Sequence, residues 1–352
     1  MSQGSPDPVA APRRRLRRLR RSDCSGSGIQ RRRRGRGFSY ADADGAAITD
    51  ESTLERIRAL AIPPAWREVW ICTDPLGHLQ ATGFDDAGRK QYLYHELWRS
   101  RRDREKFDRM ADFGQALPRL RRHASEGLAG DDLDEPRVLA CAVRLLDVGL
   151  FRVGGEEYAE QGGGLGLATV GKEHVRVEGD SIVFDYPAKS GVRRHHQVSD
   201  PEAVAVVRAL KRRRGGGPQL LAHRVGRRWH DVRSDDINDY IKEHLGAEYS
   251  AKDFRTWNAT VLAAVVVAAD RATARTKTAR KRTVDAAVRA VSEELGNTPA
   301  VARRSYIDPR VFDRYRSGSV IALPRSGVGA LNAADGRARR RIELAVLELL
   351  GE

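Results

Sequence analysis

Hydrophobic residues recur every three or four positions through much of the C-terminal two thirds of this 352-residue chain. The clearest run follows a cap and first-turn proline at residues 134–136 and stops at Gly149, as expected for a buried helix. Gly296 then marks the end of a later helix, and Thr298-Pro299 the start of the next. The same periodicity predicts further helices over residues 201–213, 234–245, 253–269, 281–295, 299–306 and 337–350.

Two other stretches consist of short β-prone runs separated by turn residues. The first predicts a small antiparallel meander with strands at residues 68–73, 79–84 and 89–94. The second predicts a strand cluster at residues 167–170, 174–177, 182–186 and 192–198. Between Trp98 and Arg122 the sequence is densely charged, with apolar residues at helical spacing, which predicts an exposed connecting helix.

These elements predict an α+β protein. A small antiparallel β-rich N-terminal domain precedes a mainly α-helical domain that contains a β-hairpin or three-stranded sheet. The predicted divisions are a disordered arginine-rich tail, the β-rich domain, the charged connecting helix and the helical domain, over residues 1–37, 38–98, 99–130 and 131–352.

Positive charge is concentrated at the N-terminus. The formal net charge is +15, and residues 1–37 hold twelve arginines against Asp7 and Asp23, a net of +10. Such a segment repels itself and lacks core-forming residues, so we expect it to stay disordered until it meets phosphate. It indicates a general affinity for DNA or RNA. A cleaved organelle-targeting peptide is the alternative interpretation.

Composition excludes some classes of protein. No stretch approaches the roughly 18 consecutive apolar residues of a membrane span, so a transmembrane protein is not expected. The three cysteines, Cys24, Cys72 and Cys141, are far apart and in no paired spacing. They fit neither a disulfide framework nor a zinc site, which favours a reducing compartment.

Several short motifs do not support a site. Residues 166–172 have the glycine and lysine spacing of a phosphate loop, but Glu173 replaces the magnesium-binding hydroxyl and a strand pattern follows. His174, His195 and His196 have no carboxylate or cysteine at ligand spacing, so we expect solvated or phosphate-contacting histidines. No nucleophile elbow or zincin motif is present in the sequence, which argues against hydrolases and metalloproteases.

Four separated segments each begin or end a predicted element: residues 150–154, 187–191, 252–257 and 295–306. Taken singly, the arginine, lysine and tyrosine of these segments are ordinary surface residues. Together and in this order they resemble the catalytic set of the type IB DNA topoisomerases, in the compact poxvirus-like branch that bacteria also carry. The resemblance covers nearly everything from Phe38 to about Val320 and includes the strand motif at residues 88–94.

The resemblance implies a role for each matching residue. Tyr306 would be the nucleophile, Arg152 and Arg255 the catalytic arginines, Lys189 the hairpin lysine, and Asn297 a further catalytic residue. The implied DNA-contacting residues are Gln91, Tyr92, Tyr94, Tyr158 and Lys252. Asn297 stands where the poxvirus enzymes have histidine; it can donate a hydrogen bond to phosphate but cannot carry a proton. Bacterial relatives resemble this chain in having asparagine there, so we interpret the change as tolerated.

These residue types suit phosphoryl transfer from DNA to tyrosine. Two arginine forks stabilise charge on the nonbridging oxygens and favour the phenolate of Tyr306. A lysine can protonate the departing 5′ oxygen. Because the phosphotyrosine preserves the ester, resealing needs no nucleotide. The resemblance therefore implies relaxation of supercoiled duplex DNA through a 3′-phosphotyrosyl intermediate, without ATP, metal or other cofactor.

The implied partner is double-stranded DNA, clamped by the two domains of a monomer mainly through phosphate contacts. Neither a membrane nor a small-molecule cofactor is expected, and the implied location is cytoplasmic and nucleoid-associated. Cleavage-site preference, the supercoils released per event, and the roles of the tail and the last helix stay open. Within that helix, Arg339-Arg340-Arg341 is interpreted as a solvated face.

Two alternatives carry different functions. A tyrosine site-specific recombinase uses the same arginine, lysine, arginine and tyrosine chemistry. Its second arginine normally lies in a His-x-x-Arg box, whereas this chain has Lys252-Asp253-Phe254-Arg255 and a strand-rich N-terminal domain. Both features favour the topoisomerase. The other alternative is a non-catalytic DNA-binding protein that retains the fold.

Overall fold

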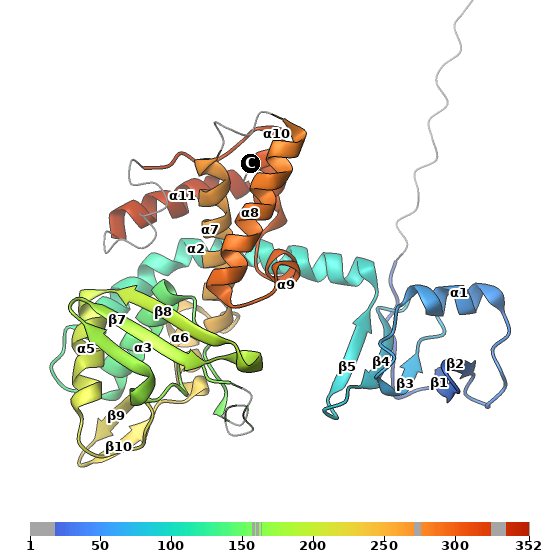
Figure 1. The fold of residues 1–352 in the computed structure, drawn as a ribbon, viewed down its shortest axis with the longest axis horizontal. Coiled ribbons are helices and arrows are strands. Elements are labelled where there is room, and N and C mark those ends of the chain that lie inside the picture. Colours follow the sequence, from blue (N-terminus) through green and yellow to red (C-terminus); the bar gives the residue numbers. More distant parts are fainter. Residues whose placement is uncertain are drawn as a thin grey trace, which may run out of the picture. The chain divides into compact units, whose positions relative to one another are not determined.

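The computed structural model describes residues 18–156, 159, 162, 164–270, 276–324 and 336–351. The chain divides into two compact units, Met1–Lys106 and Phe107–Glu352. The division falls within the long helix α2 (Glu96–Leu128), where the charged connecting helix was expected. The elements, drawn in Figure 1, form the predicted α+β protein.

The first unit contains a five-stranded antiparallel sheet with the strand order β2-β1-β3-β4-β5. Its strands are β1 (Ile29–Arg34), β2 (Gly37–Ala41), β3 (Arg67–Ile71), β4 (Leu79–Phe84) and β5 (Lys90–Tyr94). The predicted meander is β3-β4-β5. Helix α1 (Glu51–Ala59), which was not predicted, begins after Asp50, whose side chain accepts from the amide of Thr53 at 2.8 Å. Its one buried residue, Ile57, gives little periodic signal.

The prediction of a disordered tail over residues 1–37 is wrong for its C-terminal part. The run Arg31–Arg34 lies in β1, which pairs with β2 and β3. Arg31 donates to the carbonyl of Trp66 at 2.6 Å and lies over the Phe38 ring, 4.2 Å from its centre. Backbone pairing and contacts such as those of Arg31 hold this arginine run in a strand. The net charge of the segment does not reveal these interactions. Residues 1–17 lie outside the described residues.

The second unit is mainly helical, as predicted. Besides most of α2, its helices are α3 (Glu135–Gly149), α5 (Pro201–Arg212), α6 (Ser234–Leu245), α7 (Ala251–Ala269), α8 (Lys277–Leu295), α9 (Pro299–Ser305), α10 (Pro309–Ser317) and α11 (Gly336–Gly351). All but α10 match predicted helices. In the core, Trp257 of α7 is fully buried against Gly114 of α2. A Cβ at Gly114 would come within 2.5 Å of the indole ring, so this close approach requires glycine.

A three-stranded antiparallel sheet lies in this unit, as predicted. Its order is β6-β7-β8, with β6 (Val175–Glu178), β7 (Ser181–Pro187) and β8 (Arg193–Ser199). The 3-10 turn η2 (Lys189–Gly191) joins β7 to β8, and η1 (Lys172–His174) precedes β6. A hairpin that was not predicted is formed by β9 (Ala222–Val225) and β10 (Arg228–Asp231).

The strand predicted at residues 167–170 is wrong, because this segment forms a turn. The amide of Leu167 donates to the carbonyl of Arg152 at 2.9 Å, and the amide of Ala168 to that of Val153 at 2.7 Å. Thr169 Oγ1 accepts from the amide of Gly166 at 3.0 Å and closes the turn. The segment that resembles a phosphate loop therefore braces the backbone at Arg152, and η1 follows it where a phosphate loop needs a longer helix.

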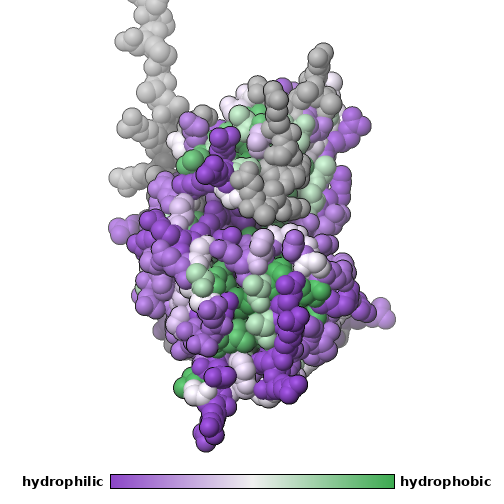
Figure 2. Space-filling model, turned by 90° about the vertical axis from the view of Figure 1, so that its left-hand side faces the viewer, coloured by the Kyte–Doolittle hydropathy of each residue, from purple (hydrophilic) through white to green (hydrophobic). Residues whose placement is uncertain are grey.

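The three cysteines are free. None of the helices in the described part of the chain combines the length and the apolar character needed to cross a membrane. Figure 2 shows one face of the molecule, where hydrophilic side chains predominate and hydrophobic residues appear in small patches.

Candidate active site

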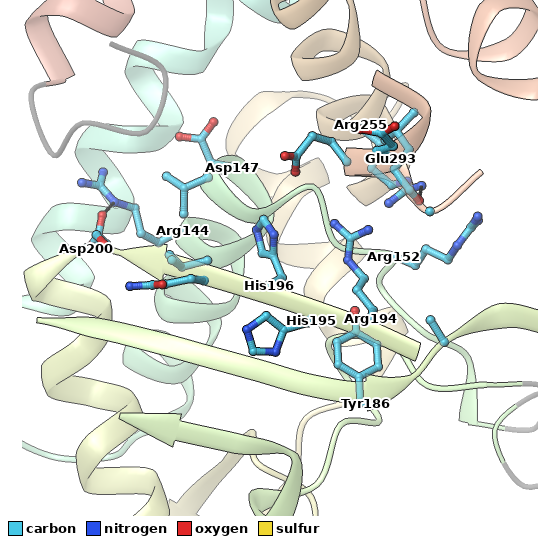
Figure 3. Close-up of a pocket in the computed structure, with 18 of the residues that line it drawn as sticks. Arg144, Asp147, Arg152, Tyr186, Arg194, His195, His196, Asp200, Arg255 and Glu293 are labelled. Carbon is cyan, nitrogen blue, oxygen red and sulfur yellow. Dashed lines mark hydrogen bonds and ion pairs between the residues drawn. The ribbon is translucent and has the colours of Figure 1, made fainter. Parts of the chain in front are cut away.

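Three of the predicted site residues, Arg152, Lys189 and Arg255, line one pocket of about 620 Å³ in the second unit. Residues of β7 and β8 form one wall, and the C-terminal end of α8 contributes to another. Figure 3 shows the side chains that project into this pocket. Segments far apart in the sequence thus converge on one cavity, as the resemblance implied for these three residues.

Arg152 is placed by an unusual turn at the end of α3. Leu150 caps the helix in the left-handed conformation at φ 52°, which costs a residue other than glycine about 1 kcal/mol. Two residues later, Arg152 Nη2 donates to Asn297 Oδ1 at 2.5 Å. The turn therefore directs this guanidinium toward the start of the α8–α9 connection.

Asn297 is held by the predicted break between α8 and α9. Gly296 ends α8 in the left-handed conformation at φ 60°, and the amide of Asn297 donates to the carbonyl of Ser292 at 3.0 Å. Thr298 then caps α9. Asn297 Nδ2 is shielded from solvent and has no partner among the described residues, which leaves one donor unused.

Arg255 is the most deeply buried of the site residues. It is 3% exposed, and its Nη atoms donate to the carbonyls of Leu150 and Leu295, the latter at 2.9 Å. Burial lowers the pKa of Arg255 to about 10, and the positive charge of Arg152 adds to this effect. The side chain therefore stays cationic at neutral pH while it ties the ends of α3 and α8 together.

Tyr306 lies beside Arg255. The Arg255 Cζ atom is 5.3 Å from the centre of the phenol ring, and the two side chains form a hydrogen bond. Burial raises the pKa of Tyr306, but Arg255 and Arg152 together outweigh it, so the net pKa is below the ordinary value. Tyr306 is 8% exposed and is not part of the pocket lining. Tyr306 therefore lies near the two arginines, but its side chain is shielded from solvent.

The backbone at Tyr306 is fixed by Thr260 of α7. Thr260 Oγ1 accepts from the amide of Asp308 at 3.1 Å, and its one hydroxyl proton is shared between the carbonyls of Thr256 at 3.0 Å and Tyr306 at 3.3 Å. Asp308, 1% exposed, in turn accepts from the amide of Arg310 at 2.9 Å at the start of α10. A buried hydroxyl and carboxylate therefore set the position at which Tyr306 leaves α9.

The two predicted lysines are both exposed. Lys189 lies in η2 and lines the pocket. A lysine that donates a proton is expected to be partly buried, but in the protein without DNA Lys189 is exposed. Lys252 lies in the first turn of α7, where its charge helps to lower the pKa of Tyr306. Its place near the phenol was not anticipated when it was assigned to DNA contact.

The predicted DNA-contacting residues of the first unit lie on β5. Tyr92, 48% exposed, stacks against Tyr94 with ring centres 6.2 Å apart. Leu93 between them packs into the cluster that contains Ile57 of α1, so the tyrosines face the opposite side of the sheet. Gln91 is on the Leu93 side and donates to Asp85 at 2.9 Å. Tyr158 lies outside the described residues.

Sequence reasoning missed Arg194, Thr260 and Asp308, and it expected His196 to be solvated or phosphate-contacting. Arg194 and His196 share one face of β8 with the buried Val198, because residues two apart on a strand point the same way. This signal was available in the sequence. Thr260 and Asp308 gave no signal in the sequence, because buried hydroxyls and helix caps are common.

Burial, together with the charges of Arg194 and His195, lowers the pKa of His196 to about 4. Within the described ranges, no group of three metal-ligating side chains is found.

Comparisons with known proteins agree with this geometry. Residues 95–318 match the family model of the eukaryotic DNA topoisomerase I catalytic core, and residues 37–85 match the N-terminal domain of bacterial DNA topoisomerase IB. The chain belongs to the type IB DNA topoisomerase family. This membership favours the topoisomerase over the recombinase alternative.

The curated relatives of this chain include viral, yeast and plant DNA topoisomerases. DNA topoisomerase 1B of Acanthamoeba polyphaga mimivirus is 29% identical over 304 residues, which cover 82% of this chain and 88% of the viral protein. DNA topoisomerase 1 of Schizosaccharomyces pombe is 24% identical over 160 residues, 45% of this chain and 19% of that protein. The corresponding protein of Daucus carota is 25% identical over 161 residues, 45% of this chain and 19% of that protein.

Proposed function

We propose that this protein relaxes supercoiled duplex DNA by cutting one strand transiently through a 3′-phosphotyrosyl intermediate, without ATP or metal. One observation carries the proposal: Arg152 and Arg255 line one pocket, Asn297 accepts a hydrogen bond from Arg152, and Tyr306 lies against Arg255. These side chains come from four separate segments, and the interior of a protein rarely brings two guanidiniums together without a counterion. A DNA phosphate supplies the missing charge.

In the cleavage step, the phenolic oxygen of Tyr306 bonds to the scissile phosphorus and the bond from phosphorus to the 5′ oxygen breaks. The phenolic proton passes to solvent, and Lys189 gives a proton to the departing oxygen. The reverse step restores the bond from phosphorus to the 5′ oxygen and breaks the bond from phosphorus to Tyr306, which regains a proton. Because one phosphoester replaces another, no nucleotide is required to reseal the strand.

The two arginines act on the transition state. Arg255 is fixed by two carbonyls and Arg152 by Asn297, so neither has to reorganise when negative charge develops on the nonbridging oxygens. Their charges also favour the anionic form of Tyr306. Asn297 can give its unused Nδ2 donor to a phosphate oxygen.

Two side chains have to change their surroundings on DNA. Tyr306 is covered, so it has to turn toward the phosphate when the duplex is bound. Lys189 is exposed on η2, and DNA that closes over the pocket would remove water from its ammonium group. Both changes follow from the filling of the pocket by the substrate.

The proposed partner is double-stranded DNA, held by a monomer without a small-molecule cofactor. Tyr92, Tyr94 and Gln91 of the first unit and Lys252 and Tyr158 of the second would contact it, together with the arginines of the tail. Since such contacts displace counterions, binding should weaken steeply as salt increases. An enzyme with this substrate would act in the cytoplasm at the nucleoid.

Covalent capture tests the proposal. The purified protein is mixed with a duplex labelled at the 5′ or the 3′ end of the cut strand, denatured, and the adduct is digested to identify the linked residue. We expect DNA joined through its 3′ phosphate to Tyr306. Tyr306→Phe should form no adduct, whereas Tyr315→Phe, which alters another buried tyrosine, should react normally. A 5′ linkage, or an adduct that survives in Tyr306→Phe, would contradict the proposal.

A further inference from the structure

Arg194 projects into the pocket from β8. Successive residues of a strand face opposite sides, and Figure 3 shows the side chains of Arg194 and His196 on one side of β8. Arg193, its neighbour, is exposed and pairs with Asp185, its Nε 2.6 Å from the carboxylate. Both arginines contribute to the lining of the catalytic pocket, but the charge of Arg193 is already paired with Asp185.

The guanidinium of Arg194 has unused donors. Its Nε and Nη2 atoms are shielded from solvent and have no hydrogen-bond partner among the described residues. Both atoms lie on the same edge of the guanidinium, the edge that binds two oxygens of one phosphate or carboxylate. Tyr186 and Glu294 favour its charge electrostatically, but neither forms an ion pair with it in the described part of the chain.

Several other partly or fully buried arginines of this unit are neutralised by carboxylates, and the buried Arg213, which has no ion pair among the described residues, donates to the carbonyls of Leu220 and Gln219. Arg144 pairs with Asp200 at 2.6 Å, Arg121 with Asp147 at 2.7 Å, and Arg310 with Asp308 at 2.8 Å. Arg152, Arg194 and Arg255, by contrast, make no ion pair with the described residues. All three line the same pocket. A shielded guanidinium without a counterion is costly, which indicates that a ligand supplies the charge.

We propose that Arg194 is a third phosphate-binding arginine of this site, which holds a DNA phosphate oxygen through its Nε and Nη2 edge. The inference rests on the proposed function and extends it, since the resemblance assigned only Arg152 and Arg255 to phosphate. The phosphate is either the scissile group or its neighbour on the cut strand, and the same chemistry recognises both.

Single-turnover cleavage tests the role. On a labelled duplex whose cut position has been mapped, Arg194→Met should form the covalent adduct at least about tenfold more slowly than the wild type. The matched control is Arg176→Met, which removes the same charge from an exposed, ion-paired arginine of β6 outside the pocket and should change the rate less than about threefold. Equal rates for the two variants would overturn the proposal.

Thermal unfolding separates binding from a structural role. Because Arg194 has no internal counterion, Arg194→Met should unfold at the wild-type temperature or above it. A slow variant that also unfolds at a clearly lower temperature would show that Arg194 supports the fold, and would overturn the assignment.

Neutral phosphates identify the contact. Duplexes that carry one methylphosphonate, either at the scissile position or at an adjacent one, are cleaved by the wild type and by Arg194→Met. Where Arg194 binds the substituted phosphate, the two proteins should react at nearly the same rate. An undiminished difference at every position would contradict phosphate binding. If the wild type forms no adduct with any duplex, the proposed function itself fails, and this inference with it.

Discussion

Arg152 Nη2 donates to Asn297 Oδ1 at 2.5 Å, although the two residues are 145 positions apart in the sequence. The amide thus orients a guanidinium without neutralising it. A carboxylate in the same place would form an ion pair with Arg152 and compete with a DNA phosphate. The identity of residue 297 therefore controls how much of the Arg152 charge is available to substrate.

This relationship predicts an order of activities. Asn297→Ala, which frees the guanidinium and removes the Nδ2 donor, should lower the single-turnover cleavage rate by about tenfold. Asn297→Asp should lower it by about a hundredfold or more, because the carboxylate takes the place of the phosphate. Adduct formation on a labelled duplex measures both rates. An Asp variant as active as the Ala variant would contradict the orienting role.

Thr260 should act on cleavage through the position of Tyr306. Thr260→Val removes the hydroxyl that bonds the Tyr306 carbonyl and the Asp308 amide, at a cost of about 1–3 kcal/mol of stability. We expect slower adduct formation with unchanged DNA affinity, measured on the same duplex by gel shift. Thr260→Ser keeps the hydroxyl and should restore most of the rate. A Val variant that reacted as fast as the wild type would show that the hydroxyl does not position Tyr306.

His196 should make stability depend on pH. Its folded pKa of about 4 lies below the ordinary value, so the unfolded chain binds the proton more readily. This contribution to stability is complete above about pH 6.5 and is lost as pH falls toward 4, with a total of about 2–3 kcal/mol. Denaturant unfolding of the wild type and of His196→Gln at pH 7 and pH 5 measures it. Parallel losses in both proteins would show that His196 does not contribute.

The last helix should stabilise the second unit through buried charges. Glu343 of α11 is fully buried and accepts from Arg121 at 2.6 Å, and Arg339 pairs with Asp147 at 2.9 Å. The interpretation of the Arg339 run as a solvated face is therefore wrong for Arg339. Glu343→Ala should lower the free energy of unfolding by about 3–5 kcal/mol, because it leaves buried arginines unpaired. The exposed Glu348→Ala should change it by less than about 0.5 kcal/mol. Equal effects would exclude the ion cluster as the cause.

Much of this arrangement was readable from the sequence. Periodicity and caps located α3, α8 and α9, because strong local signals at Gly149, Gly296 and Thr298 coincide with the fold. The resemblance supplied Arg152, Arg255 and Tyr306, and the structure brings them together. Their roles in the reaction remain proposals.

Other features depend on tertiary contacts that a single sequence does not encode visibly. The arginine run of β1 is held in a strand partly because β1 pairs with β3, whose residues lie far along the chain. The turn at residues 167–170 forms because its amides bond to Arg152 and Val153 instead of to a neighbouring strand. Whether a buried arginine has a counterion, as Arg144 does and Arg194 does not, also depends on which elements pack against it.

The most direct test of the account is relaxation of negatively supercoiled plasmid by the purified protein in EDTA without ATP. We expect the wild type to relax the plasmid through many cycles, and Tyr306→Phe to leave it supercoiled while still binding it. Loss of supercoils by Tyr306→Phe at the wild-type rate, or no relaxation by the wild type, would contradict the central claim.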